Sequence, residues 1–366
     1  MMPIDELLQY VRDYSGSDLH LVAGGVPRIR RHGSLEEVGG TERVTHEELE
    51  TALAGITPEH IWKTFIERRD MDFAYALRGV GRFRTNLFYQ EHGVGAVFRL
   101  IPEEVLPLKQ LNLPPAVERL AHLRDGLVLV TGPTGSGKST TLAGIVDVIN
   151  QNYSRHIVTI EDPVEFVHQN KASVLSHREV GADTKSFADA IRMATREDAD
   201  VLLLGELRDH ETISRALDAA EMGILVFATL HTNSASSTIA RIVDVFPGEQ
   251  QGMVRTILAG SLAAVVSQIL LPRADGRGRC AALEILLATP AVASVIRDGN
   301  THMIDSSIQS GRSEGMQLMD DAIFELAQKH MLQDGAAHLA ARDKDRFDKM
   351  APAPGQATQT AQFNRR

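Results

Sequence analysis

A glycine-rich string in the middle of the chain carries the residue types that bind phosphate. Residues 132–139 read GPTGSGKS, a complete GxxxxGK[ST] pattern. Glycines let backbone N–H groups converge on phosphate oxygens, and a helix that starts directly after the loop adds its positive N-terminal end. Lys138 can reach the β- and γ-phosphates, and the Ser139 hydroxyl can ligate Mg²⁺. The string predicts a site for ATP or GTP with Mg²⁺, made by Gly132, Pro133, Thr134, Gly135, Ser136, Gly137, Lys138, Ser139 and Thr140.

Acidic residues follow two apolar strand patterns further along the chain. LLLGE ends in Glu206, and TIED continues into Pro163, Val164 and Glu165. In α/β sheets, ligands bind at the carboxyl ends of the strands. Hydrolysis needs one carboxylate to organise a metal and another to orient or deprotonate water. A lone acidic residue at a strand end is usually a solvated cap, but two such clusters beside a phosphate loop favour catalysis, with Glu206 as a metal-holding group.

His231 follows the next apolar pattern, ILVFATL, and so ends another strand on the same predicted edge. Most of the 14 histidines in the chain require no special role. For His231, two interpretations stay open: a sensor of the γ-phosphate, or an ordinary solvated histidine.

The sequence pattern around these groups is that of a parallel sheet. From Gly126 onward, short apolar runs alternate with amphipathic helical patterns, which is typical of an α/β fold. The predicted strands are LVLVTG, HIVTIED, DVLLLGE and ILVFATLH. Beyond Pro247 the pattern predicts almost only helix, because apolar residues keep helical spacing as far as Pro272. These residues are Val254, Ile257, Leu258, Leu262, Val265 and Ile269.

The first hundred residues differ from this, with short helical and strand patterns mixed as in a small α+β domain. Thr45 and Glu48 predict a capping box, and GRFRTNLFY and GVGAVFRL predict a hairpin in which Arg82 and Arg84 share a face. Prolines then interrupt the pattern. The sequence therefore predicts the following parts: an N-terminal domain at 1–101, a linker at 102–115, an ATPase core at 116–247, a helical C-terminal region at 248–350 and a disordered tail at 351–366.

Composition and charge exclude several classes of protein. The chain has 366 residues, a net charge of −10 and one cysteine, Cys280. One cysteine excludes an intramolecular disulfide and a cysteine-only zinc site. No window reaches the run of about 18 apolar residues that a membrane span needs. The start of the chain carries Asp5 and Glu6 where a signal peptide would carry basic residues, which predicts a cytoplasmic protein. The acidic balance disfavours nucleic acid as a partner.

Four strings together resemble the type II/IV secretion ATPases, and within them the retraction (twitching motility) ATPases of type IV pili. These strings are GPTGSGKSTTL, TIEDPVEFVH, LLLGELRD and TLHTNSA, in the order that the family has them. The resemblance runs from about residue 4 to about residue 345 and includes SDLHL, GRFRTNLFYQ and RIVDVFP. Relatives for pilus extension and type II secretion carry a four-cysteine zinc motif, which one cysteine excludes here, so the retraction branch is favoured.

The resemblance implies a PAS-like N-terminal domain, a RecA-like P-loop core and a homohexameric ring. It also implies that Glu165 acts on water, that Glu206 is the Walker B carboxylate, and that His231 belongs to the catalytic set. Arg84 and Arg99 of the N-terminal hairpin would complete the site. The implied partners are an inner-membrane pilus platform protein, with which the protein would associate peripherally, and a paralogous pilus ATPase.

The chain departs from the family pattern at two places. Ile224 stands where close relatives carry a second histidine, and residues 291–298 replace a string associated with retraction. Three alternatives therefore stay open beside a retraction motor. They are a sibling motor for another pilus or secretion machine, a nucleotide-gated scaffold with negligible turnover, and a RecA-like nucleic-acid motor, which the charge disfavours.

Overall fold

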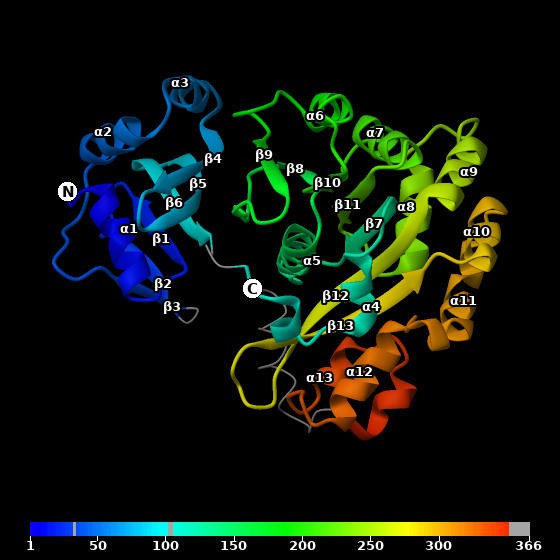
Figure 1. Ribbon diagram of the computed structural model, residues 1–366. Coiled ribbons are helices and arrows are strands. Elements are labelled where there is room, and N and C mark those ends of the chain that lie inside the picture. Colours follow the sequence, from blue (N-terminus) through cyan, green and yellow to red (C-terminus); the bar gives the residue numbers. More distant parts are fainter. Residues whose placement is uncertain (32–33, 102–104, 351–366) are drawn as a thin grey trace. The chain divides into compact units, whose positions relative to one another are not determined.

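The computed structural model describes residues 1–31, 34–101 and 105–350, so the predicted tail at 351–366 lies outside the described residues. The chain divides into two compact units (Figure 1). The first holds Met1–Glu104 together with Pro163–Val167, and the second holds Val105–Asp162 and His168–Arg366.

The first unit is an antiparallel sheet with helices on one face. Its six strands lie in the order β3-β2-β1-β6-β5-β4, and every described pairing between neighbours is antiparallel. The helices are α1 (Ile4–Asp13), α2 (His46–Ile56) and α3 (Glu59–Arg68). The strands are β1 (Asp18–Val22), β2 (Arg28–Arg31), β3 (Ser34–Glu37), β4 (Asp70–Leu77), β5 (Gly81–Gln90) and β6 (Gly93–Ile101).

Alternation along the strands gives this sheet one apolar and one polar face. On β5, Phe83 and Leu87 are buried with the apolar sides of α1, α2 and α3, whereas Arg82 and Arg84 point to the other face. Helix α2 begins at the predicted capping box, because the Thr45 side chain accepts from the backbone N–H of Glu48 and the Glu48 side chain accepts from that of Thr45. The polar face therefore carries the arginines of the predicted hairpin.

The second unit is built on a seven-stranded sheet in the order β13-β12-β7-β11-β10-β8-β9. All neighbours are parallel except β12 and β13, which form an antiparallel hairpin. The strands are β7 (Gly126–Thr131), β8 (His156–Glu161), β9 (Val174–Glu179), β10 (Val201–Leu204), β11 (Leu225–Leu230), β12 (Leu262–Pro272) and β13 (Arg279–Leu287). This is the parallel α/β sheet that the alternating pattern predicts, extended at both edges.

Helices cover both faces of this sheet (Figure 1). One face packs on α4 (Pro115–Leu120), α5 (Lys138–Asn152) and the 3₁₀ turn η1 (Leu108–Leu111). The other packs on α6 (Phe187–Ala194), α7 (His210–Glu221), α8 (Ala235–Asp244), α9 (Gln251–Ser261), α10 (Pro290–Arg297) and α11 (Ile304–Ser310). A separate cluster joins the ends of β12 and β13 to α12 (Met319–Gln328) and α13 (Ala336–Ala340). The remaining 3₁₀ turns are η2 (Thr301–Met303), η3 (Arg312–Glu314) and η4 (Asp345–Met350).

The prediction of an almost wholly helical region at 248–350 is wrong for its middle part. The helical spacing that runs on to Ile269 ends at Ser261, the last residue of α9, and residues 262–272 form β12. The run LAAVVSQILL is apolar at nearly every position, so it satisfies helical and strand periodicity equally. Pairing with β7 on one side and β13 on the other decides in favour of a strand, and burial on both faces explains its continuous apolarity.

The predicted linker at 102–115 is also partly wrong, because its later residues belong to the second unit. Leu108 of η1 is buried against α5, where Gly144 leaves room for its side chain. Residues 102–104 lie outside the described part of the chain.

None of the helices in the described residues combines the length and apolar character needed to cross a bilayer.

Candidate nucleotide site

The loop at 132–137 lies between a buried strand and the start of a long helix. β7 ends at Thr131, and α5 begins at Lys138 with Gly137 as its N-cap. The backbone takes positive φ angles at Gly132, Gly135 and Gly137, of 140°, 76° and 86°. Such angles suit glycine, and they fold the loop over the N-terminal end of α5. The local geometry is that of a phosphate-binding loop.

Glycine is needed at position 132 for a second reason, because the backbone of the neighbouring strand β12 passes very close to it. A Cβ atom at this position would lie 2.1 Å from the backbone oxygen of Gln268 on β12. No side chain fits in that space, so the loop can take this path only with glycine at its first position.

Lys138 is buried within the loop that it follows. Its side chain Nζ donates to the carbonyl oxygens of Gly132 and Pro133, at 2.9 and 3.1 Å. The residue is only 8% exposed, so its charge is held inside the curve of the loop. An ammonium group in this place can contact phosphate oxygens bound by the same loop.

The polar groups around the loop fit a nucleotide with Mg²⁺. The Ser136 hydroxyl is buried and has no hydrogen-bond partner among the described residues, which leaves it available to a ligand. Ser139 and Thr140, in the first turn of α5, are half-buried. Hydroxyl groups beside the N-terminus of a helix of 15 residues suit phosphate oxygens and a hard cation.

Glu206 and His231 are brought together at the carboxyl edge of the sheet. Glu206 follows β10 and His231 follows β11, the adjacent strand. The backbone N–H of Leu207 donates to the carbonyl of Thr229 at 2.9 Å, which ties the two strand ends to each other. As a result, His231 Nε2 lies 3.3 Å from Glu206 Oε1. The phosphate loop shares this edge, since Gly132 N–H donates to the carbonyl of Leu230.

Charged neighbours keep Glu206 ionised. Partial burial raises the pKa of Glu206, but the hydrogen bond and charge of Arg208, together with His231, outweigh burial and hold that pKa below its ordinary value. Arg208 Nε donates to Glu206 Oε2 at 2.8 Å. Glu206 is therefore a carboxylate at neutral pH, which is the form that can hold a divalent cation.

The other acidic cluster is divided between the two units. Glu161 is the buried last residue of β8, in the sheet of the second unit. Glu165 is half-buried and lies in Pro163–Val167, a segment of the first unit. The role of Glu165 on water is therefore a proposal, taken up below.

Arg84 and Arg99 are direct neighbours in the first unit. They pair across β5 and β6, and both lie on the polar face of that sheet. Arg99 Nε donates to Asp18 at 2.8 Å, and Arg84 lies 3.6 Å from Asp72. The hairpin thus carries two arginines at paired positions, and each guanidinium group turns to an acidic residue on the flanking strand, Asp18 on β1 or Asp72 on β4.

Sequence reasoning missed the residues of β12 and β13 that contact the loop. Gln268 Nε2 donates to the carbonyl of Ser136 at 2.6 Å, and Arg279 Nη1 donates to that of Gly135 at 3.2 Å. The one signal in the sequence was a glutamine inside the apolar run 262–272. The prediction of a helix there gave no reason to place this glutamine beside the loop.

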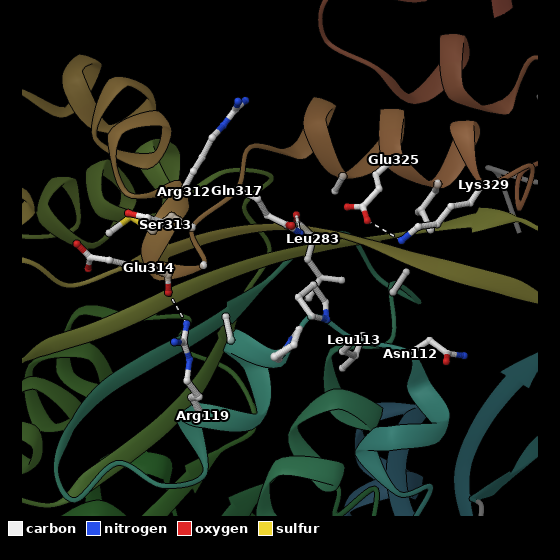
Figure 2. A pocket seen from close by; sticks show the side chains of 18 residues that line it. Asn112, Leu113, Arg119, Leu283, Arg312, Ser313, Glu314, Gln317, Glu325 and Lys329 are labelled. Atoms are coloured by element: carbon white, nitrogen blue, oxygen red, sulfur yellow. Dashed lines mark hydrogen bonds and ion pairs between the residues drawn. The ribbon is translucent and has the colours of Figure 1, made fainter.

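A pocket of about 610 Å³ lies elsewhere in the second unit (Figure 2). It is lined by residues of α4, η3, α12 and β13, and among the described residues that line it none belongs to the phosphate loop. Arg119 donates to the carbonyl of Glu314 at one end, and Gln317 Nε2 donates to the carbonyl of Leu283 at 2.8 Å. The nucleotide site is thus identified by its loop chemistry and not by the size of a cavity.

A strand, a glycine loop, a lysine at the start of a helix and a carboxylate at a neighbouring strand end define the class of P-loop nucleotide-binding proteins. The type II/IV secretion system protein family matches residues 78–346, and the chain belongs to this family.

Two curated relatives and one solved structure show how far the similarity extends. The chain is 45% identical to the type IV pilus retraction ATPase PilT of Pseudomonas aeruginosa, over 94% of this chain and 100% of PilT. It is 38% identical to the type IV pilus ATPase PilU of the same organism, over 92% of this chain and 88% of PilU. The crystal structure of the retraction motor PilT with bound ADP matches with a TM-score of 0.88 and 42% identity, over 95% of this chain and 100% of that one.

Proposed function

We propose that this protein is an ATP hydrolase that powers retraction of type IV pili, acting as a homohexameric ring on the cytoplasmic side of the inner membrane. The observation that carries the proposal is the phosphate loop with Lys138 buried inside it, next to the Glu206–His231 pair. Similarity over nearly the full length to PilT supports the retraction role.

In this proposal each loop residue has a defined task. Lys138 contacts the β- and γ-phosphates, and the loop N–H groups and the N-terminus of α5 bind their oxygens. Ser139 and Glu206 would hold Mg²⁺. When bound, this ion would neutralise charge on the phosphates and fix their orientation. His231 restrains the Glu206 carboxylate from one side, while Arg208 does so from the other.

The remaining catalytic residues come from the first unit. Glu165 orients or deprotonates the attacking water, and Arg84 and Arg99 neutralise the charge that develops on the transferred phosphoryl group. The resemblance to the secretion ATPases supports these roles, and in a ring a hairpin of one subunit can serve the loop of its neighbour. The expected partners are other copies of this chain, a pilus platform protein of the inner membrane and a paralogous pilus ATPase. No nucleic acid is expected.

The experiment that tests the retraction role is deletion and complementation in the bacterium that carries the gene. Retraction removes pili, so we expect a deletion strain to carry more surface pili and to lose twitching. A wild-type copy should restore both, and a Lys138→Ala copy should restore neither. A deletion strain without pili would indicate an assembly motor, and unchanged pili and twitching would indicate another machine.

A further inference from the structure

Gln268, on the strand that the sequence predicted as helix, lies directly beneath the phosphate loop. β12 is the parallel neighbour of β7, and Ser267 pairs with Thr131, the last residue before the loop (Figure 1). The hydroxyl groups of Ser267 and Thr131 are 2.8 Å apart, which fixes this register. The next residue, Gln268, is 2% exposed and lies below the loop itself.

The Gln268 amide uses both of its ends. Its Nε2 donates to the carbonyl of Ser136 at 2.6 Å, and its Oε1 accepts from the hydroxyl of Thr141 at 2.8 Å. A backbone carbonyl only accepts hydrogen bonds, so the amide nitrogen must face Ser136 and the amide oxygen must face Thr141. One side chain therefore connects the loop to the first turns of α5.

This connection orients a donor on the loop. In a planar trans peptide, the carbonyl and the N–H of the next residue point in opposite directions. Because Gln268 holds the Ser136 carbonyl below the loop, the N–H of Gly137 points to the other side, where a phosphate would bind. The left-handed backbone at Gly137, with φ of 86°, is part of the same arrangement.

We propose that Gln268 is a positioning residue of the nucleotide site, which holds the Ser136–Gly137 peptide in the orientation that binds phosphate. This inference rests on the proposed nucleotide site. It assigns a function in the nucleotide site to a polar side chain that is buried in a mostly apolar strand. Without its amide, the Ser136 carbonyl would be buried without a partner, and the peptide would be free to rotate.

The test measures binding of a fluorescent ADP analogue, mant-ADP, to purified full-length variants. Gln268→Leu removes both hydrogen bonds at nearly constant volume, and we expect its affinity to fall about tenfold or more. Gln317→Leu is the matched control. It removes an amide bond of the same kind, from Gln317 to the carbonyl of Leu283, at a place outside the loop. This control should keep wild-type affinity.

Gln268→Glu separates a positioning role from a purely structural one, because only the positioning role predicts that the mant-ADP affinity of this variant depends on pH. Burial favours the neutral form of the new carboxyl group, whose O–H can replace the amide donor to Ser136. Ionised at higher pH, the same group has no donor and repels the carbonyl. We therefore expect mant-ADP to bind this variant near wild-type strength at pH 6 and at least fivefold more weakly at pH 8.5, relative to wild type at each pH.

Two results would overturn the proposal. One is affinity within threefold of wild type in Gln268→Leu, and the other is a pH profile of Gln268→Glu parallel to that of wild type. If Gln268→Leu does not fold, the Gln268→Glu profile alone decides. Wild-type protein that fails to bind mant-ADP would refute the nucleotide site itself, and with it the positioning role of Gln268.

Discussion

Glu206 shows how neighbouring charges prepare a single residue for its task. Arg208 contacts one carboxylate oxygen and His231 the other, so the carboxylate keeps a fixed orientation at the edge of the sheet. The sequence places Glu206 and His231 at neighbouring strand ends, and the structure brings them to 3.3 Å. Arg208 was not predicted, because its contact depends on the turn after β10 and not on strand order.

The lowered pKa of Glu206 predicts how stability depends on pH. A carboxyl group whose pKa is lower in the folded protein stabilises it above the ordinary value of 4.5, and this contribution is lost as pH falls through the folded value. We expect the difference in free energy of unfolding between wild type and Glu206→Gln to shrink as pH falls below 4.5. Urea titrations across this range measure it, and a difference that stays constant down to pH 3 would contradict the assignment.

Substitutions of Glu165 and of Glu206 are expected to impair the ATPase reaction in different ways. Removing a group that acts on water costs about 10²–10⁴-fold in rate while nucleotide still binds. Glu165→Gln should therefore bind Mg·ATP nearly normally and lose most turnover, whereas Glu206→Gln should also change the dependence on Mg²⁺. Binding and phosphate release, measured over a Mg²⁺ series, separate the two. If Glu165→Gln keeps more than about a tenth of the rate, another group acts on water.

At the scale of elements, the sequence predicts the parallel strands well and the edges of the sheet poorly. β7, β8, β10 and β11 are short apolar runs separated by turns or helices, and their pattern has one interpretation. β12 follows the helix α9 directly, without a turn signal between them, and its apolar run has two interpretations. β9 was missed because its exposure pattern is that of an edge strand, with little apolar periodicity.

The same limit explains which site residues the sequence could not predict. A motif places Lys138 and Ser139 because their neighbours in the chain suffice to define the loop. Gln268 and Arg279 reach that loop only through the register of β12 on β7 and of β13 on β12, which no local pattern contains.

Glu284 of β13 connects two helices and predicts the opposite pH dependence to Glu206. Its buried carboxyl accepts from the backbone N–H of Ala235, at the start of α8, and of Met319, at the start of α12, at 2.8 and 3.4 Å. Burial raises its pKa, and the contribution of a group with a raised pKa is lost as pH rises through the folded value.

We therefore expect the free energy of unfolding of wild type to fall, relative to that of Glu284→Gln, as pH rises above 4.5, the ordinary pKa of a glutamate. Urea titrations of both proteins test this, with Glu325→Gln on the exposed side of α12 as the control that should show no such trend. A wild type that gains relative stability with rising pH would show that Glu284 is held as a charged group.

At the scale of the whole molecule, the residues with proposed catalytic roles are distributed over the two units. The phosphate loop, Glu206 and His231 belong to the second, and Glu165, Arg84 and Arg99 to the first. A ring offers a way for one subunit to supply its arginines to the loop of the next. Arg84→Ala and Lys138→Ala should each be inactive alone, the first because an arginine on the γ-phosphate can be worth about 10³–10⁵-fold in rate.

Mixing these two inactive proteins tests completion between subunits. Some interfaces of a mixed ring would join an intact phosphate loop to an intact hairpin, so we expect part of the ATPase activity to return. Native mass spectrometry verifies that the rings are mixed. Mixed rings without recovered activity would indicate that each loop is served by the hairpin of its own subunit.

The central claim is that the loop at 132–139 hydrolyses ATP, and phosphate release by the purified chain tests it most directly. We expect Mg²⁺-dependent release by wild type, background release by Lys138→Ala, and wild-type release by the control Lys329→Ala, whose lysine caps the C-terminal end of α12 and forms an ion pair with Glu325. Thermal unfolding should show that both variants are folded. Wild type without turnover, or a folded Lys138→Ala variant with wild-type turnover, would contradict the claim.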